Sequence, residues 1–191
     1  MAKVFDEIGD HLREWIGRQP LFFVATAPLD PEGHVNVSPK GPIGSFAVLG
    51  PRQVAYLDVN GSGVETVAHL RENGRVCVMF CAFEGPPRIV RLHGRGEAVL
   101  AGDPRCAGLL ERARFEDASI PEARRSMILI EVTRVSDSCG YGVPLMSFEG
   151  HRPHHALSSA KKVRTMGLEG YEDFQRERGR RSLDGLPALG D

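Results

Sequence analysis

The sequence predicts a mainly β protein, an antiparallel barrel with flanking helices. Six or seven segments of strand length are apolar or alternate between apolar and polar residues, and turn residues separate them. Only two or three segments have a helical pattern, and few of these lie where they could connect parallel strands, so the strands are expected to pair antiparallel. The chain has 191 residues, 41% of them hydrophobic and 26% charged, which is enough for one domain with its own core.

The first half of the chain contains one predicted helix and three predicted strands. Apolar residues recur near every 3.6 positions over residues 4–17, which predicts a helix, and Pro20 ends it. Strands are expected over residues 21–27 and 34–38, joined as a hairpin by a Pro- and Gly-containing turn. A short apolar piece at 46–49 precedes a further strand at 54–59.

The second half continues with alternating elements and then changes character. We expect a helix at 64–72 and a second at 104–115, with strands at 75–80, 88–100 and 126–135. From about Ser138 the chain is polar and basic, and a segment of this composition does not form a core of its own. Residues 1–137 are therefore predicted to form the barrel domain. Residues 138–191 are predicted to be an extension that wraps the barrel or a partner subunit, or that is partly disordered.

Composition and motifs exclude several classes of function. The net charge of −1 gives no electrostatic reason to expect nucleic acid or membrane binding, and no apolar run approaches the ~20 residues of a membrane span. The amphipathic, acidic N-terminus is unlike a signal peptide, so a cytoplasmic location is expected. The four cysteines show no disulfide or zinc spacing, and His151, His154 and His155 lack a completing ligand, so no metal is expected.

The first candidate anion site is the segment Val35–Gly41. Strand alternation places Asn36 and Ser38 on one face, and Lys40 lies just beyond the strand. A hydroxyl and an ammonium group on one side of a strand end suit a phosphate or a carboxylate. The alternative is a surface strand that carries a solvated lysine.

The second candidate is the turn Asn60-Gly61-Ser62-Gly63 with Thr66. Small residues that open a helix leave backbone N–H groups free to bind an anion. Ser62 and Glu65 could instead form a capping box, an alternative that does not exclude ligand binding. The third candidate is a row of basic residues on one strand face, formed by Arg91, His93 and Arg95, with Arg88 on the opposite face. This row is either a solvent-exposed edge or the lining of an anion site.

Three segments taken in order, LFFVATAPLDPEGHVNVSPKG, YLDVNGSGVETVAHLRENGRVCVMF and RIVRLHGRGEAV, resemble the pyridoxamine 5′-phosphate oxidase-like family of flavin-binding split-barrel proteins. The resemblance covers roughly residues 4–135. It implies a split β-barrel homodimer with FMN in a groove at the subunit interface, each site being built by both subunits. The later segments SCGYGVPL and RRSLDGLPAL also resemble a branch of this family.

The resemblance also implies roles for particular residues. The strand that contains Val37, Ser38 and Lys40 would run beside the flavin, with Lys40 helping to hold it. Asn60, Gly61 and Ser62 would contact the flavin and its ribityl chain, and Thr66 would contact the phosphate. Family members that are true oxidases carry an Arg-Lys pair at the helix start, where this chain has Thr66-Val67. Arg88, or an arginine from the partner's tail, could compensate for the two missing cations.

Three functions remain open from the sequence. The first is an FMN-dependent oxidoreductase that acts on an unidentified small molecule by hydride transfer. The second is a non-catalytic protein that binds or stores a flavin, a deazaflavin or haem, and the third is a structural dimer with a vestigial site. No catalytic residue is predicted, because in a flavin enzyme the cofactor carries the redox step. The C-terminal substrate motif of pyridoxamine phosphate oxidase is not evident, so that particular activity is not expected.

The extension is also predicted to pack across the dimer. It contains Tyr141, Leu145, Phe148, Tyr171 and Phe174, whose apolar groups would otherwise be left in water.

Overall fold

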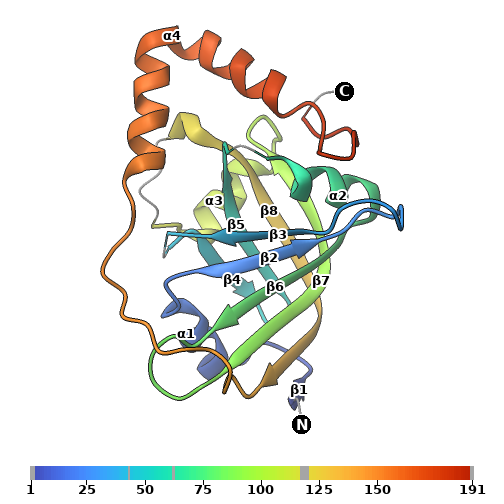
Figure 1. Ribbon diagram of the computed structural model, residues 1–191, viewed down its shortest axis with the longest axis vertical. Helices are drawn as coiled ribbons and strands as arrows, with labels where there is room; N and C mark the ends of the chain where they lie inside the picture. The colour runs from blue at the N-terminus through green and yellow to red at the C-terminus, as the bar shows by residue number, and fades with distance from the viewer. Residues whose placement is uncertain (1–2, 43, 62, 117–120, 190–191) are drawn as a thin grey trace.

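A computed structural model describes residues 3–42, 44–61, 63–116 and 121–189. Its strands are β1 (Lys3–Phe5), β2 (Phe22–Thr26), β3 (Asn36–Lys40), β4 (Phe46–Gly50), β5 (Gln53–Val59), β6 (Arg75–Cys81), β7 (Ile89–Leu100) and β8 (Arg124–Ser138). Its helices are α1 (Asp10–Gly17), α2 (Glu65–Asn73), α3 (Cys106–Ala113) and α4 (His154–Arg178), with a short 3₁₀ turn, η1 (Pro121–Ala123). Figure 1 shows these elements in place.

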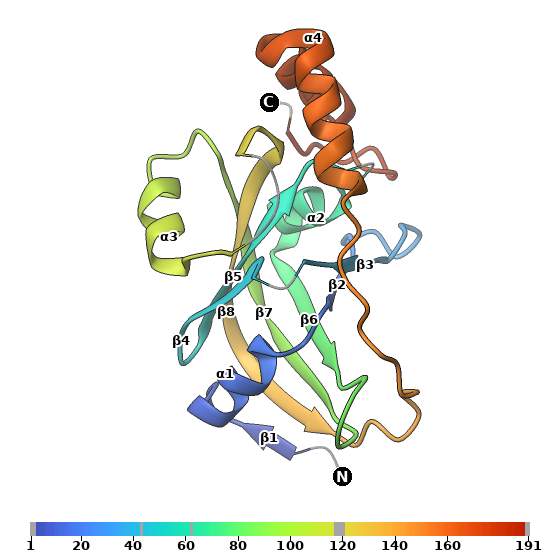
Figure 2. The same ribbon diagram turned by 90° about the vertical axis from the view of Figure 1, so that its left-hand side faces the viewer.

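The strands form one antiparallel sheet in the order β3-β2-β6-β7-β8-β5-β4, and β1 adds to β8. The sheet curls around its own inner face, but its two end strands, β3 and β4, do not pair with each other (Figures 1 and 2). The fold is therefore a split β-barrel with flanking helices, and the predicted fold class is confirmed.

The inner face of the barrel holds the main core. Phe22 lies at its centre, with its ring centroid 5.1 Å from that of Phe46, 5.4 Å from Tyr56 and 5.8 Å from Phe80. Aromatic rings at these separations contribute packing beyond the area that they bury. One end of this core is covered by α1 and another by α2, whose buried side chains join the same cluster.

The predicted helix over residues 4–17 is wrong in its first third. Lys3–Phe5 is a strand, paired with β8 from Lys3↔Asp137 to Phe5↔Val135, and α1 begins only at Asp10. β8 continues beyond its pairing with β5, which leaves backbone groups there that β1 satisfies. All four cysteines are free: Cys81 is buried, Cys77 and Cys106 are half-buried, and Cys139 is exposed.

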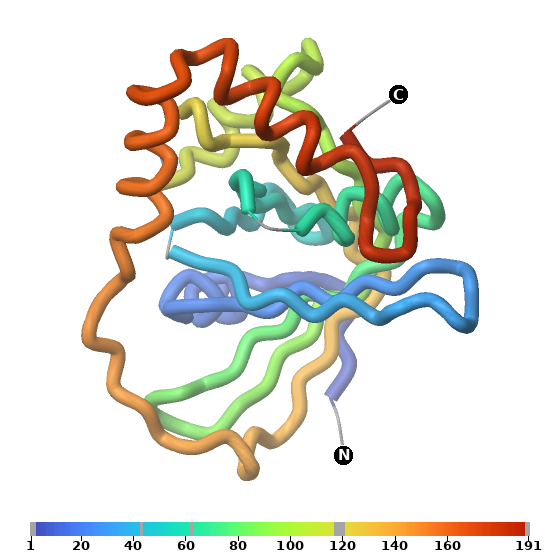
Figure 3. Tube along the Cα trace, turned by 45° about the horizontal axis from the view of Figure 1, so that its top comes forward, coloured from blue at the N-terminus to red at the C-terminus, as the bar shows by residue number. Residues whose placement is uncertain are grey.

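The extension has three parts in the structure. A connector (residues 139–153) leaves the end of β8 in extended form, and α4 follows with a break at Gly167, where φ is 74°. A hook (residues 179–189) then returns to the barrel, where Ala188 is fully buried against the main core (Figures 1 and 3). Tyr171 is buried, whereas Tyr141 and Leu145 are exposed.

No helix among the described residues combines the length and the apolar character needed to cross a bilayer.

Candidate functional site

The two segments predicted to bind an anion meet in the structure. On β3, Asn36, Ser38 and Lys40 are half-buried and alternate with exposed residues, as the strand pattern predicted. Asn36 Nδ2 donates to Thr66 Oγ1 at 3.1 Å, and Ser38 Oγ donates to Asn36 Oδ1 at 3.0 Å. The strand and the first turn of α2 are therefore joined by side-chain hydrogen bonds into one polar cluster.

The cluster continues into the core through Thr26 and His69, both of which are buried. Asn36 Nδ2 lies 3.3 Å from Thr26 Oγ1, which is 2.9 Å from His69 Nδ1. Burial lowers the pKa of His69 below its ordinary value, although acidic side chains led by Asp184 oppose the shift. A neutral imidazole is therefore expected at neutral pH, and hydrogen bonds rather than ion pairs hold this part of β3 in place.

A buried carboxylate, Asp58 on β5, organises the cations beside this cluster. Its Oδ2 is 2.7 Å from Arg125 Nε, and its Oδ1 is 3.4 Å from Lys40 Nζ. Burial by itself would raise the pKa of Asp58, but the Arg125 and Lys40 charges, with hydrogen bonds from Arg125 and Ser126, hold it below its ordinary value. Arg125 Nη1 also donates to the carbonyl of Gly63 at 3.0 Å, so the same arginine fixes the turn before α2.

Tyr56 lies under Lys40, whose Nζ is 6.0 Å from the centroid of the phenol ring. Burial, and then the nearby Asp58 charge, raise the pKa of this phenol well above its ordinary value. The tyrosine therefore remains protonated and presents a neutral ring to the lysine.

A cleft of about 1370 Å³ opens between the barrel and the connector. Its walls come from the end of α1, the ends of β3 and β5, the loop between β6 and β7, the connector and the first residues of α4. The aromatic lining residues are Trp15, Phe83 and Phe148, the cationic ones are Arg18, Lys40, Arg88 and Arg152, and the carboxylate is Glu84.

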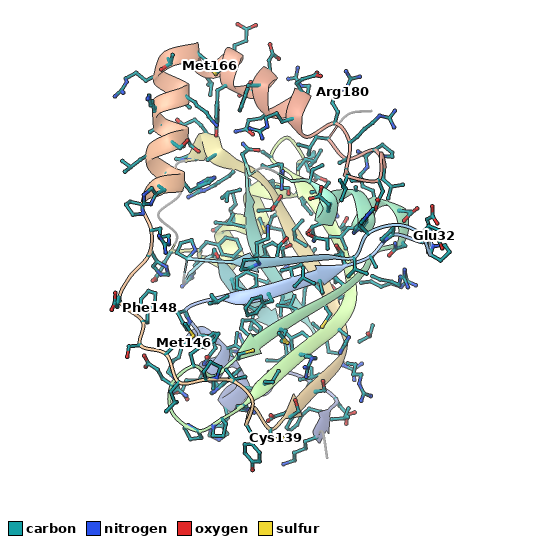
Figure 4. All side chains as sticks on the ribbon, viewed as in Figure 1. Glu32, Cys139, Met146, Phe148, Met166 and Arg180 are labelled. Atoms are coloured by element: carbon teal, nitrogen blue, oxygen red, sulfur yellow. The ribbon has the colours of Figure 1, made fainter. Side chains whose placement is uncertain are left out.

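The connector forms the outer wall of this cleft, and its attachment to the opposite wall is specific. Met146 N donates to the carbonyl of Phe83 at 2.9 Å, and Phe148 N donates to Glu84 Oε1 at 3.2 Å. Figure 4 shows Met146 and Phe148 on this segment, beside the barrel.

The predicted site residues divide between the cleft and its surroundings. Lys40 and Arg88 line the cleft, whereas Ser38 and Thr66 belong to the polar cluster beside it. Val37 points to the outer face of β3 and is 60% exposed.

The turn before α2 is reached by the extension. The carbonyl of Asn60 is 2.6 Å from Nε2 of His155, at the start of α4. Gly61 is exposed, and Ser62 lies outside the described residues.

Arg88 and Lys40 line the cleft from different strands. The strand order β3-β2-β6-β7 separates Lys40, on β3, from the start of β7 by three strand spacings, about 14 Å measured along the curved sheet. Arg88 Nε and Nη2 lie 2.9 and 2.7 Å from Asp137 Oδ2, and its Cζ is 4.9 Å from the centroid of the Trp15 ring. The structure therefore does not bring Arg88 to Thr66.

The first turn of α2 carries an acidic side chain. The N-cap residue is Val64, which makes no side-chain cap hydrogen bond, and the capping-box alternative involves Ser62, which lies outside the described residues. Glu65 folds back over Gly63, where its Oε2 occupies the space that a Cβ atom would need. This carboxylate lies in the first turn of α2, where the resemblance places the phosphate, and its negative charge disfavours a phosphate there.

Several residues of this region were not predicted as site residues from the sequence, among them Trp15, Asp58, Arg125 and His155. Asp58 had a recognisable signal, since it is the charged residue within an otherwise apolar buried strand and so requires a buried cation. Trp15 lies on the apolar side of the helix, and a residue that lines a cleft fits that pattern as well as a core residue does. His155 was considered only as a metal ligand, and the described residues hold no cluster of three or more potential ligands.

The basic row on β7 does not line the cleft. Arg91 Nη1 donates to Ser138 Oγ, and Arg95 Nη1 donates to the carbonyl of Asn73. β7 lies between β6 and β8, and of this row only Arg95 is exposed while Arg91 and His93 are half-buried, so the row is not a solvent-exposed edge either.

Comparisons with known proteins agree with this architecture. The sequence signature of the family described as pyridoxamine 5′-phosphate oxidase matches residues 8–139. The chain is 42% identical over 199 residues to the pyridoxamine 5′-phosphate oxidase family protein ustO of Aspergillus flavus, an alignment that covers 99% of this chain and 78% of the relative.

Two solved structures share the fold at low sequence identity. A conserved protein of unknown function from Corynebacterium diphtheriae superimposes with a TM-score of 0.51 at 12% identity, over 73% of this chain and 98% of that one. A candidate 5-nitroimidazole antibiotic resistance protein from Bacteroides thetaiotaomicron gives a TM-score of 0.50 at 16% identity, over 72% of this chain and 86% of that one.

Proposed function

The chain belongs to the pyridoxamine 5′-phosphate oxidase family, and on that premise we propose that it binds FMN in the cleft and acts with it as an oxidoreductase on a small organic molecule. The observation that supports this most directly is the junction of β3 with the start of α2, through Asn36 and Thr66, beside a cleft that Lys40 enters. Two segments about thirty residues apart, each of which the family pattern assigns to the cofactor, are thus held together at one site.

The cleft suits a flavin in chemistry and in size. A flavin offers a flat, largely apolar ring system and an anionic phosphate, and the cleft offers aromatic walls and four cationic side chains. Its volume of about 1370 Å³ is ample, because pockets for single small ligands usually measure about 300–1,000 Å³. The residues present therefore fit the group, although the acidic Glu65 makes the start of α2 a poor phosphate site.

Each predicted residue has a proposed part in holding the cofactor. Lys40 supplies positive charge at one end of the cleft, and its ion pair with Asp58 fixes its position. Ser38 and Thr66 keep β3 in register with α2, and the backbone at Asn60 and Gly61 borders the ribityl chain. When bound, the flavin supplies hydride-transfer chemistry. The protein orients the flavin and sets the local charge, and the connector, as the outer wall of the cleft, limits the access of water.

We propose that the protein works as a homodimer whose subunits share the cofactor sites. Val35 and Val37 are 69% and 60% exposed on the outside of the hairpin that contains β3. Apolar side chains grouped on an outer face are typical of an interface. Because Val37 faces away from its own cleft, it could contact a flavin only in a site that the partner completes. The free cysteines are compatible with a reducing compartment, in line with the proposed cytoplasmic location.

The test is the absorption spectrum of the purified protein before and after incubation with FMN and gel filtration. We expect bands near about 375 and 450 nm that elute with a dimer, as for a bound oxidised flavin. Lys40→Ala should weaken FMN binding about tenfold or more, since a hydrogen bond to a charged group contributes about 1.5–3 kcal/mol. Thr66→Val should weaken it less, and Lys161→Ala, which removes an exposed charge on α4, should not change it.

The alternatives give different results in the same experiment. A colourless protein that takes up a deazaflavin or haem would replace FMN with that cofactor. A flavin that binds but is not reoxidised saturably by any small molecule would favour the storage protein. If no cofactor binds and the variants behave as the wild type does, the oxidoreductase proposal is wrong and a structural dimer remains.

A further inference from the structure

We propose that the Arg88 end of the cleft is a separate subsite for a small organic carboxylate with an apolar body. The proposal that the substrate of the reaction binds in this subsite rests on the proposed flavin function. The proposal that the subsite binds an organic anion does not depend on it. The argument depends on how Arg88 is held, on what surrounds it and on how far it lies from Lys40.

The guanidinium group of Arg88 is fixed in one orientation. Asp137 Oδ2 accepts a hydrogen bond from Nε and forms an ion pair with Nη2, and the Trp15 ring covers one face at 4.9 Å from Cζ. Nη1 has no hydrogen-bond partner among the described residues, and the side chain is 27% exposed. An arginine that is already oriented loses little entropy when a ligand takes its remaining edge.

The backbone of Arg88 is fixed as well. Its carbonyl accepts from Ala82 N at 2.8 Å, which extends the pairing of β6 with β7 by one bond. On the other side Gly140 packs so closely that a Cβ atom there would lie 2.7 Å from Arg88 N. The arginine is therefore a rigid part of the cleft wall.

The surroundings favour a monoanion with an apolar body. Trp15, Phe83, Pro86, Pro87 and Phe148 line this end of the cleft. Asp137 already balances much of the Arg88 charge, and Glu84 adds a further negative charge to the same wall. A carboxylate, with one charge, suits this balance better than a phosphate dianion does.

The cleft has room for this ligand beside a flavin. Its volume of about 1370 Å³ exceeds the range of about 300–1,000 Å³ for single small ligands, and roughly 14 Å separates the strand positions of Lys40 and Arg88. A flavin at the Lys40 end would leave the Arg88 end for a second molecule.

The chain contains one tryptophan, Trp15, which therefore reports on this subsite directly. Phenylacetate is titrated into flavin-free and FMN-loaded protein while tryptophan fluorescence is followed. We expect a saturable change in both, at least tenfold weaker affinity in Arg88→Ala, and weaker affinity in Arg88→Lys, because lysine lacks the planar fork. Arg95→Ala, which removes an exposed arginine of β7 outside the cleft, should bind as the wild type does.

Three results of the titration would overturn the proposal. The first is that the tryptophan fluorescence of the folded wild type shows no saturable change. The second is an Arg88→Lys variant that melts normally and binds phenylacetate with wild-type affinity, and the third is tighter binding of phenyl phosphate than of phenylacetate. Competition between FMN and phenylacetate would also overturn it, since the two sites would then overlap. Phenylacetate binding that depends on Arg88 in a protein that refuses FMN would support the subsite while the proposed flavin function fails.

Discussion

Asp58→Asn is the substitution whose effect on stability the structure defines best. The side chain of Asp58 is fully buried, and the Arg125 side chain that it pairs with is only 7% exposed. Removing one partner of a buried ion pair costs about 3–5 kcal/mol, because the other charge is left without compensation. Asparagine keeps the shape and can still accept one hydrogen bond, so we expect the lower end, about 3 kcal/mol of unfolding free energy.

The measurement is urea unfolding at pH 7, supported by thermal melting. For a chain of this size a loss of 1 kcal/mol lowers Tm by about 2–4 °C, so about 3 kcal/mol corresponds to roughly 6–12 °C. The matched control is Asp173→Asn, which removes a surface carboxylate that is 65% exposed and paired with Arg176. Exposed pairs contribute little, and the control should stay within about 0.5 kcal/mol of the wild type. A loss below about 1 kcal/mol for Asp58→Asn would refute the reasoning.

The pH dependence gives a second check on the same variant. The pKa of Asp58 is lowered in the folded protein, so at low pH the unfolded chain binds the proton more readily. The stabilisation is therefore complete above the ordinary aspartate pKa of about 3.9 and is lost as the pH falls through the folded value. The difference between the wild type and Asp58→Asn should be constant from pH 7 to about 5 and shrink below about 4.

Two further predictions concern packing and titration. Gly140→Ala should lower the unfolding free energy by about 1–3 kcal/mol and weaken phenylacetate binding, because the new Cβ meets the backbone of Arg88. A variant that melts and binds phenylacetate as the wild type does would contradict the described packing. His69→Gln should reduce the loss of stability between about pH 6.5 and 5.5, since burial lowers the pKa of His69 and the unfolded chain protonates first as the pH falls. His93 has a pKa shifted in the same direction, so part of the slope should remain; identical slopes in urea unfolding at pH 7.5, 6.5 and 5.5 would refute the assignment to His69.

Local patterns in the sequence predicted most of the barrel. Alternation and turn residues placed the β2–β3 hairpin, and the apolar stretch before the Asn60 turn placed β5. These signals are local, since each strand shows its own inner and outer faces. The same alternation placed Asn36, Ser38 and Lys40 on one face, which is why this part of the candidate site could be predicted.

Features that depend on distant contacts could not be predicted in this way. Val4 and Phe5 fit a helical period, and only the free end of β8 makes them a strand. Trp15 lies on the apolar side of α1 whether that side meets the core or a cleft, so periodicity cannot separate the two cases. The 25 residues of α4 contain few buried side chains, and the extension is held on either side of them, by the hydrogen bonds of the connector and by the hook, where Ala188 enters the core.

β3 ends the sheet on one side, and its fourth residue, Pro39, has consequences for self-association. A free strand edge is a template for adding another chain through backbone hydrogen bonds, which is a common route to aggregation. Proline has no N–H to offer, so a ladder built on β3 would lack one hydrogen bond next to the last residue of the five-residue strand. This weakens the edge for a second copy of the chain, and we expect a dimer that uses this region to dock against the broad side of the hairpin.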